Sequence, residues 1–208
     1  MLKSMILASL LFVLASAPAR AVFLSIDPPS QAVSAGSAFD IAVTVSGLGG
    51  FVPPTVSVFD LDIDFDPLVT GFQSVEFGQH LGDINAFEAS ILFDTLRDAD
   101  TVHVGESSFL EESSTSCIVC LPPYLEDLQP DTFVLATLHF NALLPGVADF
   151  RVSVNSFGDG FGNPLAVDQI DNGSVSVTTV PEPPVLLLFA FVGLAMMVRW
   201  YLTRGVAA

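Results

Sequence analysis

Three aspartates in the short sequence DLDIDFDP are the first residues whose type and spacing could do chemistry. Asp60, Asp62 and Asp64 alternate with apolar residues. On a strand, residues two apart lie about 6.6 Å apart at Cα, which overlaps the carboxyl separation of an inverting glycosidase. A calcium loop with these acids at positions one, three and five would need glycine and glutamate where Phe65 and Gly71 stand. The triplet is therefore a candidate for paired-carboxylate hydrolysis, for weak cation binding, or for the solvent face of a strand.

A second acidic group lies near the end of the apolar-patterned region, in GDGFGNPLAVDQIDNG. It contains Asp159, Asp168 and Asp171 among glycines and asparagines. Loop oxygens of this kind suit a hard cation such as Ca²⁺. The same residue types are common in solvated turns, because they tolerate unusual backbone angles. These three acids join the first three as weak cation candidates, and no other cofactor is expected.

Motifs for other kinds of catalysis are missing from the sequence. There is no G-x-S-x-G stretch, no pair of histidines with metal-ligand spacing, and no glycine loop followed by lysine. The sequence offers few aromatic residues for a flat sugar-binding surface, since the single tryptophan, Trp200, is near the C-terminus. Tyr124, beside Pro122 and Pro123 in a predicted exposed loop, is the best single candidate for a sugar contact. The sequence predicts that the protein is not an enzyme.

The two cysteines, Cys117 and Cys120, form a C-x-x-C motif. In an exported chain this spacing favours a small disulfide loop. Free thiols, or metal and redox chemistry, are the alternatives. Because two prolines follow at once, the helix that lowers the pKa of a thioredoxin-type thiol is not expected here.

The elements that must position these residues are short β-strands. Apolar residues recur at every second position in several stretches bounded by glycine, proline and asparagine, a pattern typical of half-buried strands. In 59–65 the apolar residues would face the core, so the three aspartates would share the other face. The region 84–96 is ambiguous and could hold a turn or short helix, and 107–128 is predicted to be a long loop. The strand-like stretches are 24–26, 39–45, 59–65, 134–140, 150–154 and 175–177.

This middle region, 22–180, carries 22 acidic side chains against only Arg97 and Arg151, a formal net charge of −20. Such a surface repels nucleic acid and anionic lipid.

The order of these stretches resembles the cohesin domain, which belongs to the superfamily of cellulose-binding modules. The similarity is carried by DPPSQAVSAGSAFDIAVTVSG, DLDIDFDP, GFQSVEFG, FVLATLHFNALLPGVADFRV and DNGSVSV. The resemblance covers essentially all of 22–180. It implies an all-β, jelly-roll-like β-sandwich of about nine strands, acting as a binding module without catalysis. Cohesins bind dockerins, but no binding residue is transferred from the family.

The first 21 residues have the pattern of a signal peptide. Lys3 precedes an apolar run, Met5–Ala15, and small residues end the segment at Ala21. We expect signal peptidase to remove it, with an uncleaved anchor as the alternative.

The last 28 residues, 181–208, resemble the PEP-CTERM sorting signal of Gram-negative bacteria. The motif Pro181-Glu182-Pro183 precedes an uncharged apolar run, and Arg199 and Arg204 follow it. A transmembrane helix is expected at about 185–202. The resemblance implies recognition by an exosortase, with membrane anchoring before cleavage and release or surface attachment afterwards.

Together these patterns predict an exported, non-enzymatic surface or extracellular-matrix protein that binds protein or polysaccharide. The alternatives are a secreted polysaccharide hydrolase with paired aspartates and a calcium-stabilised adhesin. If the tail sorts the protein, deletion of 181–208 should move it from the cell envelope to the periplasm or medium. An unchanged location in a fractionation experiment would contradict that expectation.

Overall fold

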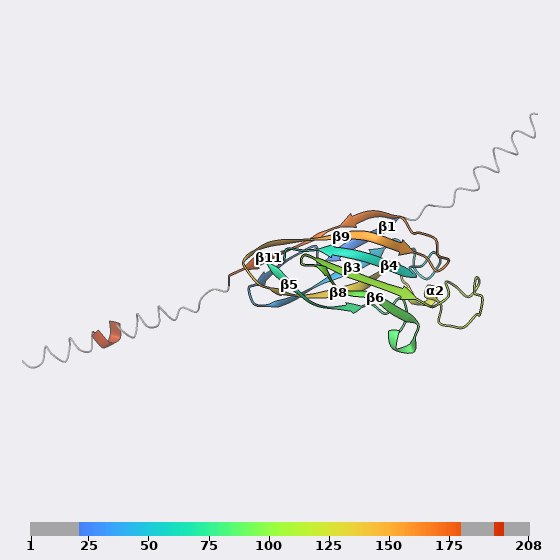
Figure 1. The fold of residues 1–208 in the computed structure, drawn as a ribbon, viewed down its shortest axis with the longest axis horizontal. Coiled ribbons are helices and arrows are strands. Elements are labelled where there is room, and N and C mark those ends of the chain that lie inside the picture. The colour runs from blue at the N-terminus through green and yellow to red at the C-terminus, as the bar shows by residue number, and fades with distance from the viewer. Residues whose placement is uncertain (1–20, 180–193, 198–208) are drawn as a thin grey trace, which may run out of the picture. The chain divides into compact units, whose positions relative to one another are not determined.

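Two β-sheets face each other in the computed structural model of this protein, which describes residues 21–179 and 194–197 (Figure 1). The described part contains eleven strands where the sequence predicted about nine. A 3₁₀ helix, η1 (Ile84–Ala86), and a four-residue helix, α2 (Leu125–Leu128), complete it. The strands are β1 (Val22–Asp27), β2 (Ser30–Ser34), β3 (Ala38–Ser46), β4 (Val58–Asp64), β5 (Thr70–Phe77), β6 (Ala89–Asp98), β7 (Thr101–Ser108), β8 (Thr132–Ala142), β9 (Gly146–Gly158), β10 (Val167–Asp171) and β11 (Gly173–Thr178).

One sheet has the strand order β10-β1-β3-β8-β5 and the other has the order β2-β11-β9-β4-β7-β6. Successive strands mostly alternate between the two sheets, and at one edge the chain passes from β1 to β2 and from β10 to β11. At these crossings β1 pairs with β10 in parallel, and β2 pairs with β11 in parallel. The other ladders are antiparallel. This is an all-β sandwich, as the sequence predicted.

Alternation along the central strands places their core side. In β4, Phe59, Leu61 and Ile63 are fully buried, so the aspartates between them lie on the outer side of the six-stranded sheet. The same alternation buries one side of β3 and β1. Because apolar area removed from water contributes about 25 cal/mol per Å², these inward faces hold the two sheets together.

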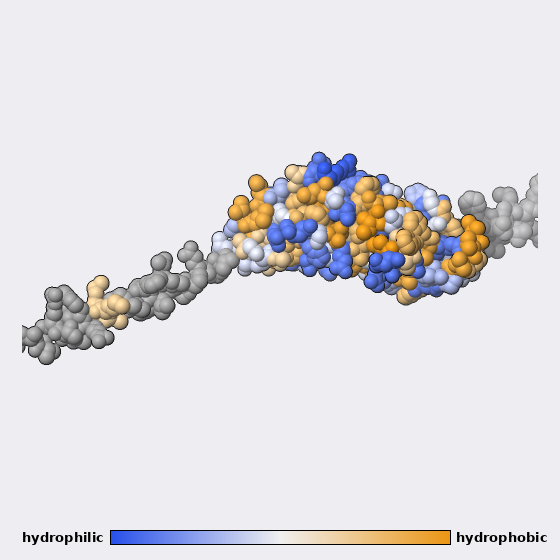
Figure 2. All heavy atoms as spheres, turned by 60° about the horizontal axis from the view of Figure 1, so that its bottom comes forward, coloured by the Kyte–Doolittle hydropathy of each residue, from blue (hydrophilic) through white to orange (hydrophobic). Residues whose placement is uncertain are grey.

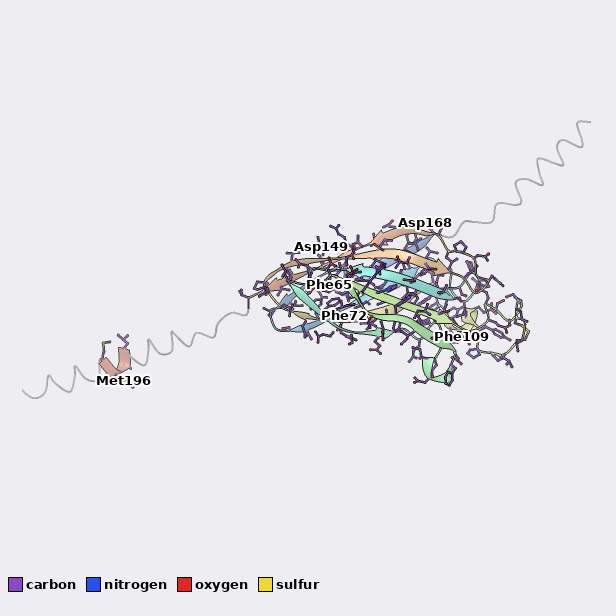
Figure 3. All side chains as sticks on the ribbon, viewed as in Figure 1. Phe65, Phe72, Phe109, Asp149, Asp168 and Met196 are labelled. Carbon is purple, nitrogen blue, oxygen red and sulfur yellow. A yellow bond between two sulfur atoms is a disulfide. The ribbon has the colours of Figure 1, made fainter. Side chains whose placement is uncertain are left out.

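Phenylalanines dominate the centre of the sandwich. The ring of Phe140 lies 5.1–5.7 Å from the ring centroids of four other phenylalanines, and its own side chain is fully buried. Two of these partners, Phe65 and Phe72, are labelled in Figure 3. The four partners are Phe39, Phe65, Phe72 and Phe150.

Bulges interrupt the alternation at positions that the sequence pattern did not predict. Leu135 is an extra residue between the pairs Val43↔Ala136 and Thr44↔Val134. An extra residue reverses the side on which the following side chains lie. Val134, expected in the core, is therefore only partly buried, and Leu135 is fully buried.

The ambiguous region 84–96 contains both η1 and most of β6. Two bulges break the period of two in β6, at Leu92 and at Arg97. The strand lies at an edge of its sheet and is exposed along most of its length. The short, half-exposed edge strands β2 and β10 were not among the predicted stretches, because they have little alternation.

The predicted signal peptide, 1–21, lies outside the described residues except for Ala21, and so does most of the predicted transmembrane helix, 185–202. Residues 194–197 form a turn of helix. Within the described ranges, no helix is long and apolar enough to cross a membrane. The chain divides into two units, Met1–Thr178 and Thr179–Ala208.

Candidate functional site

The three aspartates of β4 are joined to polar groups of neighbouring strands. The imidazole Nε2 of His103 on β7 lies 2.6 Å from Oδ1 of Asp60, and the guanidinium of Arg97 on β6 donates to Oδ2 of Asp62 at 2.7 Å. Asp64 accepts a hydrogen bond of 2.8 Å from the hydroxyl of Thr101. The mutual repulsion of the carboxylates is therefore offset by neighbouring side chains and not by water alone.

Asn155 connects two of these carboxylates. Its Nδ2 donates to Asp60 Oδ1 and to Asp62 Oδ2, both at 3.0 Å. Asn155 is the extra residue of a bulge in β9, because Asp60 pairs with Ser156 and Leu61 pairs with Val154. Bulges commonly redirect a side chain, and here the bulge turns an amide toward the acids. We call the set Asp60, Asp62, Asp64, Arg97, Thr101, His103 and Asn155 the outer-face network.

An aromatic ring lies flat against this network. Phe93 of β6 stacks on His103, with ring centroids 3.8 Å apart and an angle of 14° between the ring planes. It also covers Gly105, where an added Cβ would come within 3.1 Å of the Phe93 ring. Phe93 is 40% exposed, and Arg97 beside it has a 52% exposed side chain. The arrangement is a fixed, half-exposed ring surrounded by charged and amide groups.

Paired-carboxylate hydrolysis requires one carboxyl with a raised pKa beside another. A carboxyl with a raised pKa is that of Glu106, whose pKa is raised to about 8 because its side chain is buried. Glu106 lies on β7 with its side chain fully buried, and alternation along β7 places His103 and Thr101 on the opposite, outer side. The acid with the raised pKa is thus directed to the core and not to Asp60 or Asp62, and the geometry does not favour a hydrolase.

The second acidic group is not assembled into one site. Asp159 is buried, and its carboxylate accepts the backbone N–H of Phe161 and Asn163 and the amide of Asn163, so it shapes a turn. Asp168 and Asp171 lie on the exposed strand β10, and Asp168 is labelled in Figure 3. Among the residues that the structure describes, no group of three or more His, Cys, Asp or Glu side chains could hold a metal ion.

The C-x-x-C motif forms a disulfide between Cys117 and Cys120. The carboxylate of Glu111 accepts the backbone N–H groups of Ile118, Val119 and Cys120, and these bonds hold the pKa of Glu111 below its ordinary value. The disulfide and Glu111 fix the loop together.

Tyr124 does not lie where the sequence suggested. It is only 9% exposed and precedes α2, whose Leu125 is fully buried. The backbone of Leu125 is bonded to the carbonyl of Glu111, which draws this part of the loop against the sandwich. A sugar contact through an exposed Tyr124 is therefore wrong, because loop packing covers the ring.

Comparison with known proteins gives similarity in structure only. No family model matches the chain, and no curated protein does. The sixth cohesin of scaffoldin B from Acetivibrio cellulolyticus, solved in complex with a Cel5 dockerin, matches with TM-score 0.56 and 20% identity, covering 76% of this chain and 99% of that one. The fold is cohesin-like.

Two further cohesins show the same fold at lower identity. A Clostridium thermocellum cohesin, Coh-OlpC in complex with Doc435, matches with TM-score 0.57 and 12% identity over 80% of this chain and 99% of that one. A non-cellulosomal cohesin from the archaeon Archaeoglobus fulgidus matches with TM-score 0.52 and 16% identity, covering 76% and 91%. The cohesin-like sandwich predicted from the order of strand-like stretches is confirmed.

Proposed function

We propose that this protein is a non-enzymatic binding module that recognises a protein partner through the outer face of β9, β4, β7 and β6. The observation that carries the proposal is the Phe93 ring, held flat by His103 and Gly105 and left 40% exposed. Rigid aromatic and arginine side chains supply most of the energy at protein interfaces. Because the surrounding bonds fix Phe93 and Arg97 beforehand, little conformational entropy is lost on binding.

One apolar neighbour, the bulged residue Leu92, extends this surface beside Phe93. It is 44% exposed, and its Cβ lies next to Gly105 on the same side of β7 as the Phe93 ring. The two side chains give the face an apolar centre beside a charged network, as is common at protein interfaces. Ile91 and Leu96 pair with the inward-facing Glu106 and Val102, so they lie on the other side of β6. Figure 2 shows apolar residues gathered in several groups on one side of the domain.

A protein partner is favoured over a polysaccharide. Phe93 stacks on a histidine and has charged neighbours, whereas a sugar platform needs open rings, and Tyr124 is buried. Two of the similar structures are cohesins solved with dockerins. That likeness supports a protein ligand here without identifying it as a dockerin.

The location of the module rests on the two ends of the sequence. We infer export by the signal peptide and recognition by an exosortase through Pro181, Glu182 and Pro183, with Arg199 and Arg204 at the cytoplasmic end. The module would then act in the envelope or extracellular matrix of a Gram-negative bacterium.

The proposal is tested with two matched single variants of the full-length chain. Phe93→Ala removes the ring from the face. Phe161→Ala removes a phenylalanine ring that is 56% exposed in the loop after β9, outside the network. Proteins captured from the native envelope by the wild-type chain are identified, and their affinities are measured by calorimetry.

We expect the face variant to weaken the affinity of the captured partner at least about tenfold, as for interface hot spots. The control variant should stay within about twofold. The proposed function would be contradicted if a partner bound both variants with equal affinity. It would also be contradicted if the wild-type chain bound purified glycans but no protein.

A further inference from the structure

One strand of the six-stranded sheet lacks a neighbour along half of its length. β9 has 13 residues, but its ladder with β11 covers only Gly146–Phe150. The reason is the change of sheet between β10 and β11: before Gly173 the chain belongs to the other sheet and pairs with β1. Between Arg151 and Ser156, β9 therefore has β4 on one side and no partner strand on the other, and at Phe157 and Gly158 residues 163–165 pair with its edge.

On this edge the backbone groups of Val154 are unpaired, between two neighbours whose groups are partly satisfied. In a strand, the N–H and C=O of successive residues point to alternate sides. The N–H of Val152 points away from β4, because it donates to Oδ1 of Asn172 at 3.1 Å. Val154, two residues later, must point the same way, and no described group bonds to its N–H or C=O on that side. Beyond the bulge, the C=O of Phe157 also points outward and accepts the N–H of Leu165 at 2.9 Å.

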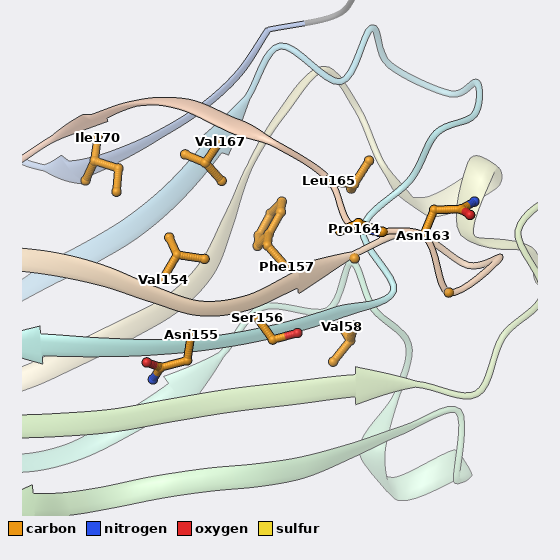
Figure 4. A pocket seen from close by; sticks show the side chains of 12 residues that line it. Val58, Val154, Asn155, Ser156, Phe157, Asn163, Pro164, Leu165, Val167 and Ile170 are labelled. Carbon is orange, nitrogen blue, oxygen red and sulfur yellow. The ribbon is translucent and has the colours of Figure 1, made fainter.

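A groove of about 630 Å³ lies beside this edge, between β9 and β10. Figure 4 shows Val154 and Phe157 of β9 directed toward Val167 and Ile170 of β10, while Asn155 and Ser156 point to the other side of β9. The lining is apolar except for amide, hydroxyl and backbone groups, and it contains no charged side chain. An apolar floor beside unpaired strand N–H and C=O groups fits an extended peptide.

We propose that the groove binds an extended segment of a basic partner protein, which adds as a short strand beside residues 152–156 of β9 and bonds to the backbone of Val154. Alternate apolar side chains of the segment would enter the groove, and the intervening side chains would face solvent. The outward positions should be basic, since Asp168 and Asp171 on β10 are exposed near the groove and the domain has a net charge of −20. This surface does not include Phe93, although Asn155 borders both it and the outer-face network, and the proposal does not rest on the proposed function.

Charge and topology disfavour other occupants. A second copy of this chain would bring another strongly acidic domain against the groove. The C-terminal segment begins at the other end of β9, because β11 runs antiparallel to it and Thr178 follows Val177, the partner of Gly146. The N-terminal segment joins β1 beside Val167, so its removal is included as an arm of the test.

The test uses nine-residue synthetic peptides with Val, Ile or Leu at alternate positions and Lys or Thr between them. A control peptide has the same composition with its apolar residues clustered. Each peptide is added to the full-length chain, and amide hydrogen exchange is followed by NMR while affinity is measured by fluorescence anisotropy. We expect an alternating peptide to bind and to slow exchange of the Val154 amide at least about tenfold, and the clustered peptide to bind at least about tenfold more weakly.

Two neighbouring residues of β10 provide matched variants, since Ile170 is directed into the groove and the exposed Gln169 does not line it. Ile170→Arg should weaken binding of the alternating peptide at least about tenfold, whereas Gln169→Arg should change it by less than about threefold. If the two variants lose the same affinity for the peptide, the effect is due to the added positive charge and not to the groove, and the proposal is overturned. It is also overturned if no alternating peptide protects Val154, or if only a chain lacking residues 1–20 binds.

Discussion

Replacing Phe140 with alanine is expected to lower the free energy of unfolding of the domain by about 3–5 kcal/mol. The side chain is fully buried, and its ring lies 5.1 Å from that of Phe150 and 5.2 Å from that of Phe65. Truncation removes the apolar area of the ring and leaves a cavity that its neighbours can fill only in part. Loss of several aromatic pairs adds to this cost, because each such pair contributes about 0.5–1.5 kcal/mol beyond area burial.

The measurement is urea denaturation followed by circular dichroism, with Phe161→Ala as the matched control. Phe161 is 56% exposed, so its truncation should change stability by less than about 0.5 kcal/mol. If Phe140→Ala costs no more than Phe161→Ala, the phenylalanine cluster does not form the centre of the core as described.

Replacing Glu106 with glutamine is expected to remove a large pH dependence of stability. The side chain is fully buried, neither carboxyl oxygen has a hydrogen-bond partner among the described residues, and burial raises the pKa to about 8. In the folded protein Glu106 keeps its proton up to that pH, whereas in the unfolded chain it loses the proton near its ordinary pKa of 4.5. Stability is therefore fully present below about pH 4.5 and falls as pH rises toward 8.

Each unit of pH in that window costs about 1.4 kcal/mol. Between about pH 5 and about pH 8, the wild-type protein should lose on the order of 4 kcal/mol relative to Glu106→Gln. Glu76→Gln is the control, since Glu76 has an 80% exposed side chain. Parallel stability–pH curves for the wild-type protein and Glu106→Gln would show that the Glu106 pKa is close to its ordinary value.

The strand pattern predicted the core side of the sandwich because burial there depends on local alternation. In β4 the period of two placed Phe59, Leu61 and Ile63 inside and the three aspartates outside, and the structure agrees. The same rule was wrong for Val134, since a bulge is a mismatch between two strands and is absent from the pattern of either strand alone.

The candidate site could be predicted only in part, for the same reason. The aspartates were visible as a local pattern, but Asn155, His103 and Arg97 reach them from three other strands. Asn155 depends on a bulge and Arg97 on an edge strand that was not predicted. Two signals were available in the sequence. Arg97 is one of only two lysine or arginine residues in the domain, and the apolar run ILF ends in Phe93.

Loop residues were the least predictable, because their burial depends on contacts distant in the sequence. Asp159 was a candidate for weak cation binding or for a solvated turn, yet it is buried by the turn that its own carboxylate organises. Glu112 is buried for a similar reason, since it accepts the backbone N–H groups of Thr55 and Gly160 and joins two loops.

The central claim is that the outer face around Phe93 binds the partner protein. The most direct test is hydrogen–deuterium exchange of the full-length chain with and without the captured partner. The account predicts that protection on binding is concentrated in β6 and β7, residues 89–108, and includes Phe93 and His103. Protection confined to other parts of the domain, with exchange in β6 and β7 unchanged, would contradict it.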